Sequence, residues 1–202
     1  SKTEASSTAE LVYDFLVDVG LDKYIDVQIA ESLYTGILMD TGSFRYATNP
    51  HVFEIAGALK RLGMDDYMLQ IRLFNSMTEK QLRLLGHCLA NRMELLSEYQ
   101  AGIIWLDKED YKTWSIGRGD TEGIVNYILM VRNMKMAVFV SEQQNVTKLS
   151  FRSKGSINVQ EICQKYFNGG GHRNASGGQI KASVQETVAK VKEIIPITMN
   201  AY

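Results

Sequence analysis

The sequence predicts an α/β fold in which a helical N-terminal part precedes a compact mixed-sheet domain. Within residues 1–100, apolar residues recur at the three- and four-residue spacing of amphipathic helices. From residue 101 onward, short apolar runs alternate with polar turns and helical segments, which is typical of an α/β domain. With 202 residues, 45% of them hydrophobic, the chain is long enough for one large domain or two small ones.

The first predicted elements are helices joined by polar turns. Residues 11–19 carry apolar side chains at helical spacing and are followed by Gly20, where a glycine commonly ends a helix. The apolar stretch 27–38 predicts a second helix, which leads into the polar sequence 40–43, Asp-Thr-Gly-Ser. Pro50 then opens a third helical segment, since proline is favoured in the first turn of a helix.

Residues 76–100 are predicted to form a long helix that connects two lobes. Ser76 and Glu79 have the spacing of a capping box, in which each side chain satisfies a free backbone N–H group of the other residue. The apolar side chains that follow form a single stripe on this helix: Leu82, Leu85, Leu89, Met93 and Leu96. His87 lies between two members of the stripe, so we expect it on the solvated face.

Residues 101–202 are predicted to form a compact α/β domain. We expect strands over 103–106, 111–116, 136–140 and 146–151. We expect helices over 123–132 and 159–167. A last helix should begin at Ser183, which has a capping-box partner in Glu186, and should stop at Pro196.

The composition excludes several classes of protein. The formal net charge of -1 does not indicate a duplex-binding protein, so any nucleic-acid contact should be local and short. Cys88 and Cys163 are far apart and lack a CxxC partner, which argues against a disulfide framework and against a structural zinc site. No apolar run approaches the roughly 18 residues of a membrane span. We therefore expect no membrane partner and a cytoplasmic location.

Residues 166–178, Tyr-Phe-Asn-Gly-Gly-Gly-His-Arg-Asn-Ala-Ser-Gly-Gly, carry the most informative pattern. Gly169, Gly170 and Gly171 exceed what the end of a helix needs, because a single glycine there is routine. Consecutive glycines let main-chain N–H groups converge on an anion, and His172 adds a side-chain donor. The pattern favours a phosphate-binding loop, with a purely structural helix end as the alternative.

Two further segments carry polar residues suited to a nucleotide. Arg152 ends a predicted strand, where it could hold a phosphate with two parallel hydrogen bonds. A lone arginine, however, is more often simply exposed. Asp120, Glu122 and Asn126 lie where a turn enters a predicted helix. Capping of that helix is the alternative role for the acidic pair.

Five segments, taken in order, resemble the motifs of the DHH phosphoesterase family. They are ASSTAE at 5–10, GILMDTGSFRY at 36–46, DTEGIVN at 120–126, SFRS at 150–153 and GGGHRNASG at 169–177. The resemblance covers nearly the whole chain. Its order and spacing are similar to those of the branch that degrades short RNA oligomers or linear dinucleotides and often dephosphorylates 3'-phosphoadenosine 5'-phosphate. The Gly-Gly-Gly-His run resembles the marker of the DHH-associated C-terminal domain.

This resemblance implies a hydrolase with two divalent cations, usually manganese, that activate water and neutralise phosphate charge. Asp40 matches the last metal-binding motif, which makes it the candidate catalytic and metal-binding residue. Taken alone, an aspartate near a helix end is more often a cap or turn residue. By the same resemblance, the candidate substrate-binding residues are Arg152, Ser153, Gly169, Gly170, Gly171 and His172, with Asp120, Glu122 and Asn126 bordering the same cleft.

The resemblance also implies a division of the chain. Residues 1–75 would be the helical remainder of a DHH metal-binding domain, 76–100 a connector helix, and 101–202 the substrate-binding domain. The Asp-His-His triplet of the family does not occur in these 202 residues. We therefore expect that the sequence begins inside a larger fold, and that this chain alone supplies the substrate-binding half of a phosphoesterase and hydrolyses nothing.

Two other functions are alternatives to this one. A non-catalytic nucleotide- or RNA-binding module is the main alternative, because the same C-terminal domain occurs in alanyl-tRNA synthetases. Asp40 in its Thr-Gly-Ser-Phe-Arg setting argues against it, since a pure binding module needs no metal-site motif. A single-strand DNA exonuclease would favour a basic groove with stacking aromatic residues, and the sequence has no such stripe. No feature predicts an oligomeric state.

Overall fold

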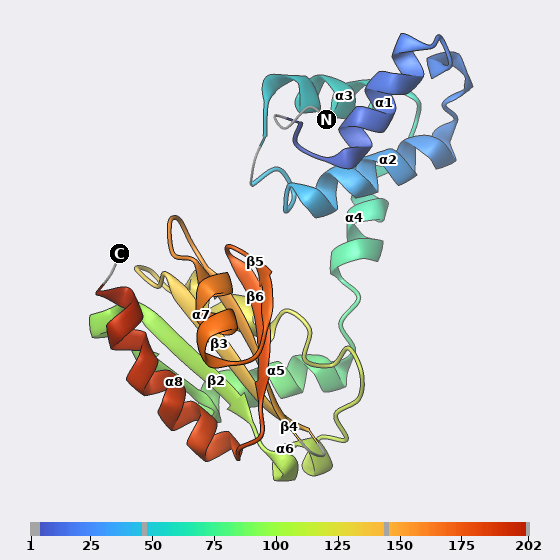
Figure 1. Ribbon diagram of the computed structural model, residues 1–202. Coiled ribbons are helices and arrows are strands. Elements are labelled where there is room, and N and C mark those ends of the chain that lie inside the picture. The colour runs from blue at the N-terminus through green and yellow to red at the C-terminus, as the bar shows by residue number, and fades with distance from the viewer. Residues whose placement is uncertain (1–4, 46–47, 144–145, 201–202) are drawn as a thin grey trace. The chain divides into compact units, whose positions relative to one another are not determined.

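The structure is a computed structural model that describes residues 5–45, 48–143 and 146–200 (Figure 1). The chain divides into two compact units, residues 1–76 and 77–202. The mixed α/β fold predicted from the sequence is confirmed. No helix in the described part of the chain is long and apolar enough to cross a membrane.

Unit 1 is helical. It contains α1 (Thr8–Asp18), the short 3-10 helix η1 (Asp22–Tyr24), α2 (Val27–Asp40), α3 (Pro50–Arg61) and α4 (Asp66–Phe74). The three helices predicted in this region are present, whereas α4 was not predicted. Each α-helix begins at a residue whose side chain accepts a hydrogen bond from the first turn: Ser7, Asp26, Asn49 and Asp65. The core lies mainly between α2 and α3, where Ile37, Val52 and Leu59 are fully buried.

The predicted connector helix is shorter than expected. Helix α5 (Glu79–Asn91) begins after Thr78, which forms a capping box with Gln81 in place of the predicted pair Ser76 and Glu79. The chain then extends into strand β1 (Met93–Leu96), so residues 76–100 are not one helix. The buried side of α5 consists of Leu84, Leu85 and Cys88, and these residues pack against the sheet of unit 2.

Unit 2 is built on a six-stranded mixed sheet in the order β1-β2-β3-β4-β6-β5. After β1 and the 3-10 turn η2 (Ser97–Tyr99), the strands are β2 (Ala101–Leu106), β3 (Met136–Gln143), β4 (Val146–Ser153), β5 (Gly170–His172) and β6 (Ala175–Ile180). Strands β2 and β3 are parallel, and the other neighbours are antiparallel.

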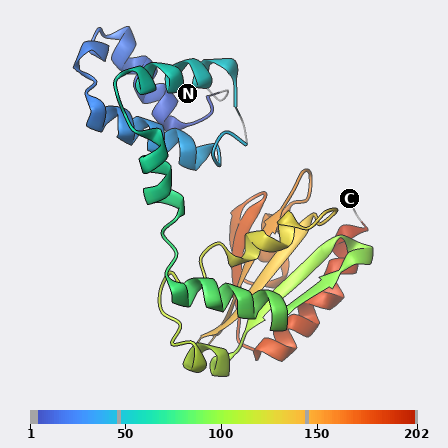
Figure 2. The same ribbon diagram turned by 180° about the vertical axis from the view of Figure 1, so that it is seen from behind.

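Helices cover the two faces of this sheet unequally. Helices α7 (Val159–Tyr166) and α8 (Val184–Met199) cover one face, which Figure 1 shows in front. Helix α5 and the 3-10 helix η3 (Ile124–Met130) pack on the opposite face, which Figure 2 shows from behind. Among the described residues, the core on that second face draws on β1, β2 and β3 but on no residue of β4, β5 or β6. On this second face β5, β6 and the part of β4 beyond η3 are therefore left without a helical cover.

Three other differences from the sequence prediction have local causes. Residues 111–116 were expected as a strand, but α6 (Lys108–Thr113) forms there because Asp107 and Asp110 make a capping box. Helix α8 continues through Pro196 to Met199, since a proline close to the last turn removes few of the helix's hydrogen bonds. The short strands β1, β5 and β6 were missed.

Candidate functional site

The sheet register brings Arg152 and His172 onto one face. His172 of β5 pairs with Ala175 of β6, and Ala175 pairs in turn on its other side with Arg152 of β4. Directly paired residues on neighbouring strands point to the same face of a sheet. The two side chains are therefore two strand spacings apart, about 10 Å between Cα atoms, with only the methyl group of Ala175 between them.

The neighbouring row on the same face has almost no side chains. Gly170 of β5 pairs with Gly177 of β6, which pairs with Ser150 of β4. A Cβ atom added at Gly170 would meet nothing within 4 Å, and one at Gly177 would meet only the Leu149 carbonyl oxygen, at 3.4 Å. This row forms a flat, open floor beside Arg152 and His172.

The other two glycines of the run have a different role. A Cβ atom at Gly169 would lie 2.0 Å from the carbonyl oxygen of Gly177, and one at Gly171 would lie 2.7 Å from that of Ala175. Gly171 also has a positive φ of +144°. These glycines let β5 approach β6 closely. The run thus forms a flat edge strand instead of the expected loop of converging N–H groups.

Ser153 points away from this face. It is 9% exposed, and its hydroxyl donates to the Ile157 carbonyl oxygen at 2.8 Å and accepts from Asn174 Nδ2 at 2.8 Å. Because side chains alternate along a strand, Ser150 and Arg152 face the open side. Sequence analysis missed Ser150, although the two-residue period along β4 could have identified it.

Arg152 retains most of its donors. One guanidinium nitrogen, Nη1, donates to the Phe151 carbonyl oxygen at 2.9 Å. Its other nitrogens make no hydrogen bond or ion pair with the residues that the structure describes. His172 is exposed. Both side chains are therefore accessible to an anionic ligand.

The three residues expected to border this surface lie in or before η3. Asp120 Oδ2 accepts hydrogen bonds from Lys80 Nζ at 2.5 Å and from the Gly117 backbone N–H at 2.7 Å. The hydrogen bond from Lys80 lowers the pKa of the Asp120 carboxyl below its usual value. Glu122 and Asn126 are exposed, and no side chain caps η3. Since η3 contacts both β3 and β4, it borders the open half of the sheet.

Asp40 lies in unit 1 as the last residue of α2. It is exposed, and its Oδ2 atom accepts a long hydrogen bond of 3.4 Å from the Thr8 backbone N–H at the start of α1. The same end of α1 holds the buried carboxylate of Glu10, which accepts from the Ser6 backbone N–H and from Asn49 Nδ2. No group of three or more His, Cys, Asp or Glu side chains among the described residues could hold a metal ion. These residues do not fit a two-metal centre.

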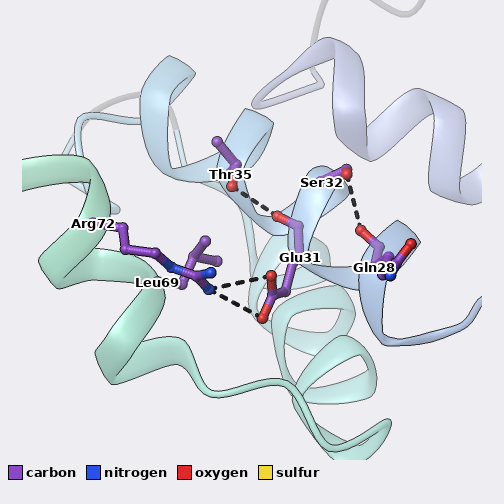
Figure 3. Close-up of a pocket in the computed structure, with 6 residues that line it drawn as sticks. All are labelled: Gln28, Glu31, Ser32, Thr35, Leu69 and Arg72. Atoms are coloured by element: carbon purple, nitrogen blue, oxygen red, sulfur yellow. Dashed lines mark hydrogen bonds and ion pairs between the residues drawn. The ribbon is translucent and has the colours of Figure 1, made fainter.

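A polar groove of about 570 Å³ lies between α2 and α4 of unit 1 (Figure 3). Arg72 forms an ion pair with Glu31 across it, at 3.2 Å. The hydroxyls of Ser32 and Thr35 donate to backbone carbonyl oxygens of α2. The residues that line the groove include none of the site residues predicted from the sequence.

The sequence analysis expected His87 on the solvated face of its helix. That expectation is wrong. The Nε2 atom of His87 lies 2.8 Å from a carboxylate oxygen of the buried Asp110, which also accepts from Arg92. Its ring lies against Trp114. The stripe interpretation failed because α5 presents Leu84, Leu85 and Cys88 to the sheet, while Leu82 is 61% exposed.

Cys88 and Cys163 are both buried and free. Burial raises the thiol pKa of Cys88 and of Cys163 to about 12. Neither thiol is a candidate nucleophile, because the thiolate is the reactive form.

Comparisons with known proteins show what the chain is similar to. Residues 111–196 match the DHHA1 domain. The chain is 31% identical over 188 residues to a membrane protein–large ribosomal subunit bL9 fusion protein of Onion yellows phytoplasma, covering 93% of the chain and 21% of that protein. It is 30% identical over 179 residues to the bifunctional oligoribonuclease and PAP phosphatase NrnA of Thermus thermophilus, covering 87% of the chain and 52% of that protein.

A solved structure extends the likeness to both units. The crystal structure of an exopolyphosphatase-related protein from Bacteroides fragilis superposes with a TM-score of 0.94 at 33% identity, covering 98% of this chain and 58% of that one. The chain spans about half the length of its NrnA relative, or less in the case of the phytoplasma protein. Residues 111–196 therefore match a DHHA1 domain, and nearly the whole chain is similar to the NrnA oligoribonucleases and to an exopolyphosphatase-related protein, in agreement with its resemblance to DHH phosphoesterases.

Proposed function

We propose that this chain is the nucleotide-binding half of a metal-dependent phosphoesterase. Its substrates would be short RNA oligonucleotides, dinucleotides and 3'-phosphoadenosine 5'-phosphate. The observation that carries the proposal is the row formed by Arg152 and His172 on the uncovered half of the sheet. In this proposal residues 101–202 bind the substrate, and residues 1–75 are the C-terminal part of the metal-binding domain.

The row offers suitable chemistry for a terminal phosphate. The free guanidinium N–H groups of Arg152 can donate two parallel hydrogen bonds to phosphate oxygens, and His172 can donate a third. The floor of Gly170, Gly177 and Ser150 would let a sugar or base lie flat beside that phosphate. A single good anion pocket needs few charges, which is compatible with a chain of net charge -1.

The catalytic part of the proposal rests on Asp40 and on the resemblance to DHH phosphoesterases. In the complete enzyme two divalent cations, with manganese as the proposed metal, would neutralise charge on the reacting phosphate. Asp40 would supply one ligand, and the Thr8 backbone N–H would orient its carboxylate. Because the described residues hold no further ligand cluster, we expect the 202-residue chain to bind nucleotides without hydrolysing them. The proposed location is the cytoplasm.

Calorimetric binding of AMP and of 5'-phosphorylated diadenylate, pApA, tests the proposal in metal-free buffer. Arg152→Gln and His172→Gln should each weaken binding of both ligands, by roughly tenfold for the arginine, which provides the charge-assisted pair of bonds. Lys165→Gln is the matched control, because Lys165 lies on α7 on the opposite face of the sheet. Equal affinities for the wild type and the two site variants would overturn the proposal.

A further inference from the structure

The open half of the sheet continues beyond Arg152 to a second polar row. Lys148 lies four residues before Arg152 on β4, so both side chains project from the same face. Lys148 pairs with Gln179 of β6, and both residues are exposed. The flat row of Gly170, Gly177 and Ser150 lies between these two ends of the surface.

The charge on this surface has one sign. The positions of β4, β5 and β6 that face the open side are Val146, Lys148, Ser150, Arg152, Gly170, His172, Ala175, Gly177 and Gln179. None of these nine is acidic, although the whole chain has a net charge of -1. This surface therefore carries basic side chains and no acidic ones, while acidic residues elsewhere in the chain make its net charge negative.

Lys148 lacks the ion pairs of several other lysines of unit 2, and although Lys112, Lys135 and Lys181 also have no ion pair with a described residue, Lys148 alone of these lies on the open face of the sheet. Lys80, Lys108 and Lys192 each form an ion pair with a carboxylate. Lys148 makes no ion pair or hydrogen bond with any residue that the structure describes. A lysine on a central strand, facing an uncovered sheet surface without a counter-ion, has the features of a ligand contact.

We propose that Lys148 and Gln179 form a second phosphate position, which binds the internucleotide phosphate of an oligonucleotide. The inference rests on the proposed function, since Arg152 and His172 would hold the terminal phosphate of the same ligand. Four residues of a strand separate the Cα atoms of Lys148 and Arg152 by roughly 13 Å. The flexible stem of the lysine lets its ammonium reach inward over the glycine floor. A mononucleotide would reach only the Arg152 end, and a dinucleotide would reach both.

The test compares AMP with pApA by calorimetry on the 202-residue chain, in metal-free buffer at several salt concentrations. For Lys148→Gln we expect pApA to bind about five- to tenfold more weakly, with AMP binding unchanged. The slope of log affinity against log salt for pApA should become shallower by about 0.7, the contribution of one single-strand phosphate contact. Lys165→Gln is the control, and it should change neither ligand.

The outcomes separate this inference from the proposal on which it rests. If pApA binds through Arg152 but Lys148→Gln leaves its affinity and salt slope unchanged, the second phosphate position is refuted and the proposed function stands. If Lys148→Gln weakens AMP and pApA equally, Lys148 contributes only general charge, and the inference is again wrong. If neither ligand binds the wild type, both ideas fail together.

Discussion

The paired substitutions Gly169→Ala and Gly170→Ala test the two roles assigned to the glycine run. At Gly169 the new Cβ atom would lie 2.0 Å from the Gly177 carbonyl oxygen and 2.6 Å from the Gly178 Cα atom. Non-bonded contacts are favourable only near roughly 3.5 Å, so β5 would have to move by more than about 1 Å from β6. Both contacts are with backbone atoms, which cannot rotate away as the end of a flexible side chain could.

The two variants should therefore differ clearly in stability. For Gly169→Ala we expect a loss of about 2–4 kcal/mol from overpacking and weakened pairing of β5 with β6. For Gly170→Ala we expect no loss and up to about 1 kcal/mol of gain, since alanine restricts the unfolded chain and its Cβ atom has open space. Gly170→Ala should nevertheless weaken AMP binding, because the methyl group would occupy the floor.

Urea denaturation followed by tryptophan fluorescence measures these differences. The chain has two tryptophans, Trp105 and Trp114, and both lie in unit 2. The signal therefore reports on the unit that contains the glycine run. Equal stabilities for the two variants, or a larger loss for Gly170→Ala, would refute the assignment of close approach to Gly169 and open space to Gly170.

Substitutions at two further positions test hydrogen bonds that stabilise unit 2. Asn174→Ala should lower the free energy of unfolding by about 1–3 kcal/mol in urea denaturation, because Asn174 Nδ2 donates to Ser153 Oγ and to two backbone carbonyl oxygens. Asn174→Asp should recover little of this stability, because a carboxylate cannot donate these hydrogen bonds. Burial acts to raise the pKa of Asp110, but hydrogen bonds led by the one from Arg92 outweigh it and lower that pKa. The stability from Asp110 should therefore be complete above its unfolded pKa of about 3.9 and be lost as pH falls through the lower folded value. Asp110→Asn should destabilise unit 2 by about 3 kcal/mol at neutral pH. It should also reduce the loss of unfolding free energy as the pH falls below about 4. An unchanged loss of stability at acid pH would contradict this role.

Local sequence signals predicted helices α1, α2 and α3 of unit 1 and the interior strands β2, β3 and β4, but not α4. The caps of α1 to α3 and of α8 depend on residues within one turn of each other, so they can be recognised without the fold. The interior strands β2, β3 and β4 have enough apolar residues to be recognised by pattern. The edge strand β5 consists of Gly-Gly-His and has no strand propensity of its own.

The failures have two physical causes. Some local signals were assigned to the wrong residues, as at α5, where Thr78 and not Ser76 is the capping residue, and at α6, which a local capping box starts. Others depend on packing: the predicted stripe on α5 included Leu82, which is exposed, and missed Leu84, which is buried. In the candidate site, the motif around Arg152 was recognised, but Ser153 was expected on the ligand side. Only the strand register shows that its hydroxyl is directed to Ile157 and that Ser150 faces the ligand side instead.

The most direct test of the central claim is a titration of the isotope-labelled chain with AMP, followed by NMR chemical shifts of backbone amides and of arginine and histidine side chains. The proposed surface predicts that the largest shifts occur at Arg152 Nε, the His172 ring and the Gly170 amide, with little change in the groove that contains Arg72. Shifts concentrated in unit 1, or no change at Arg152 and His172 while AMP binds, would contradict the claim.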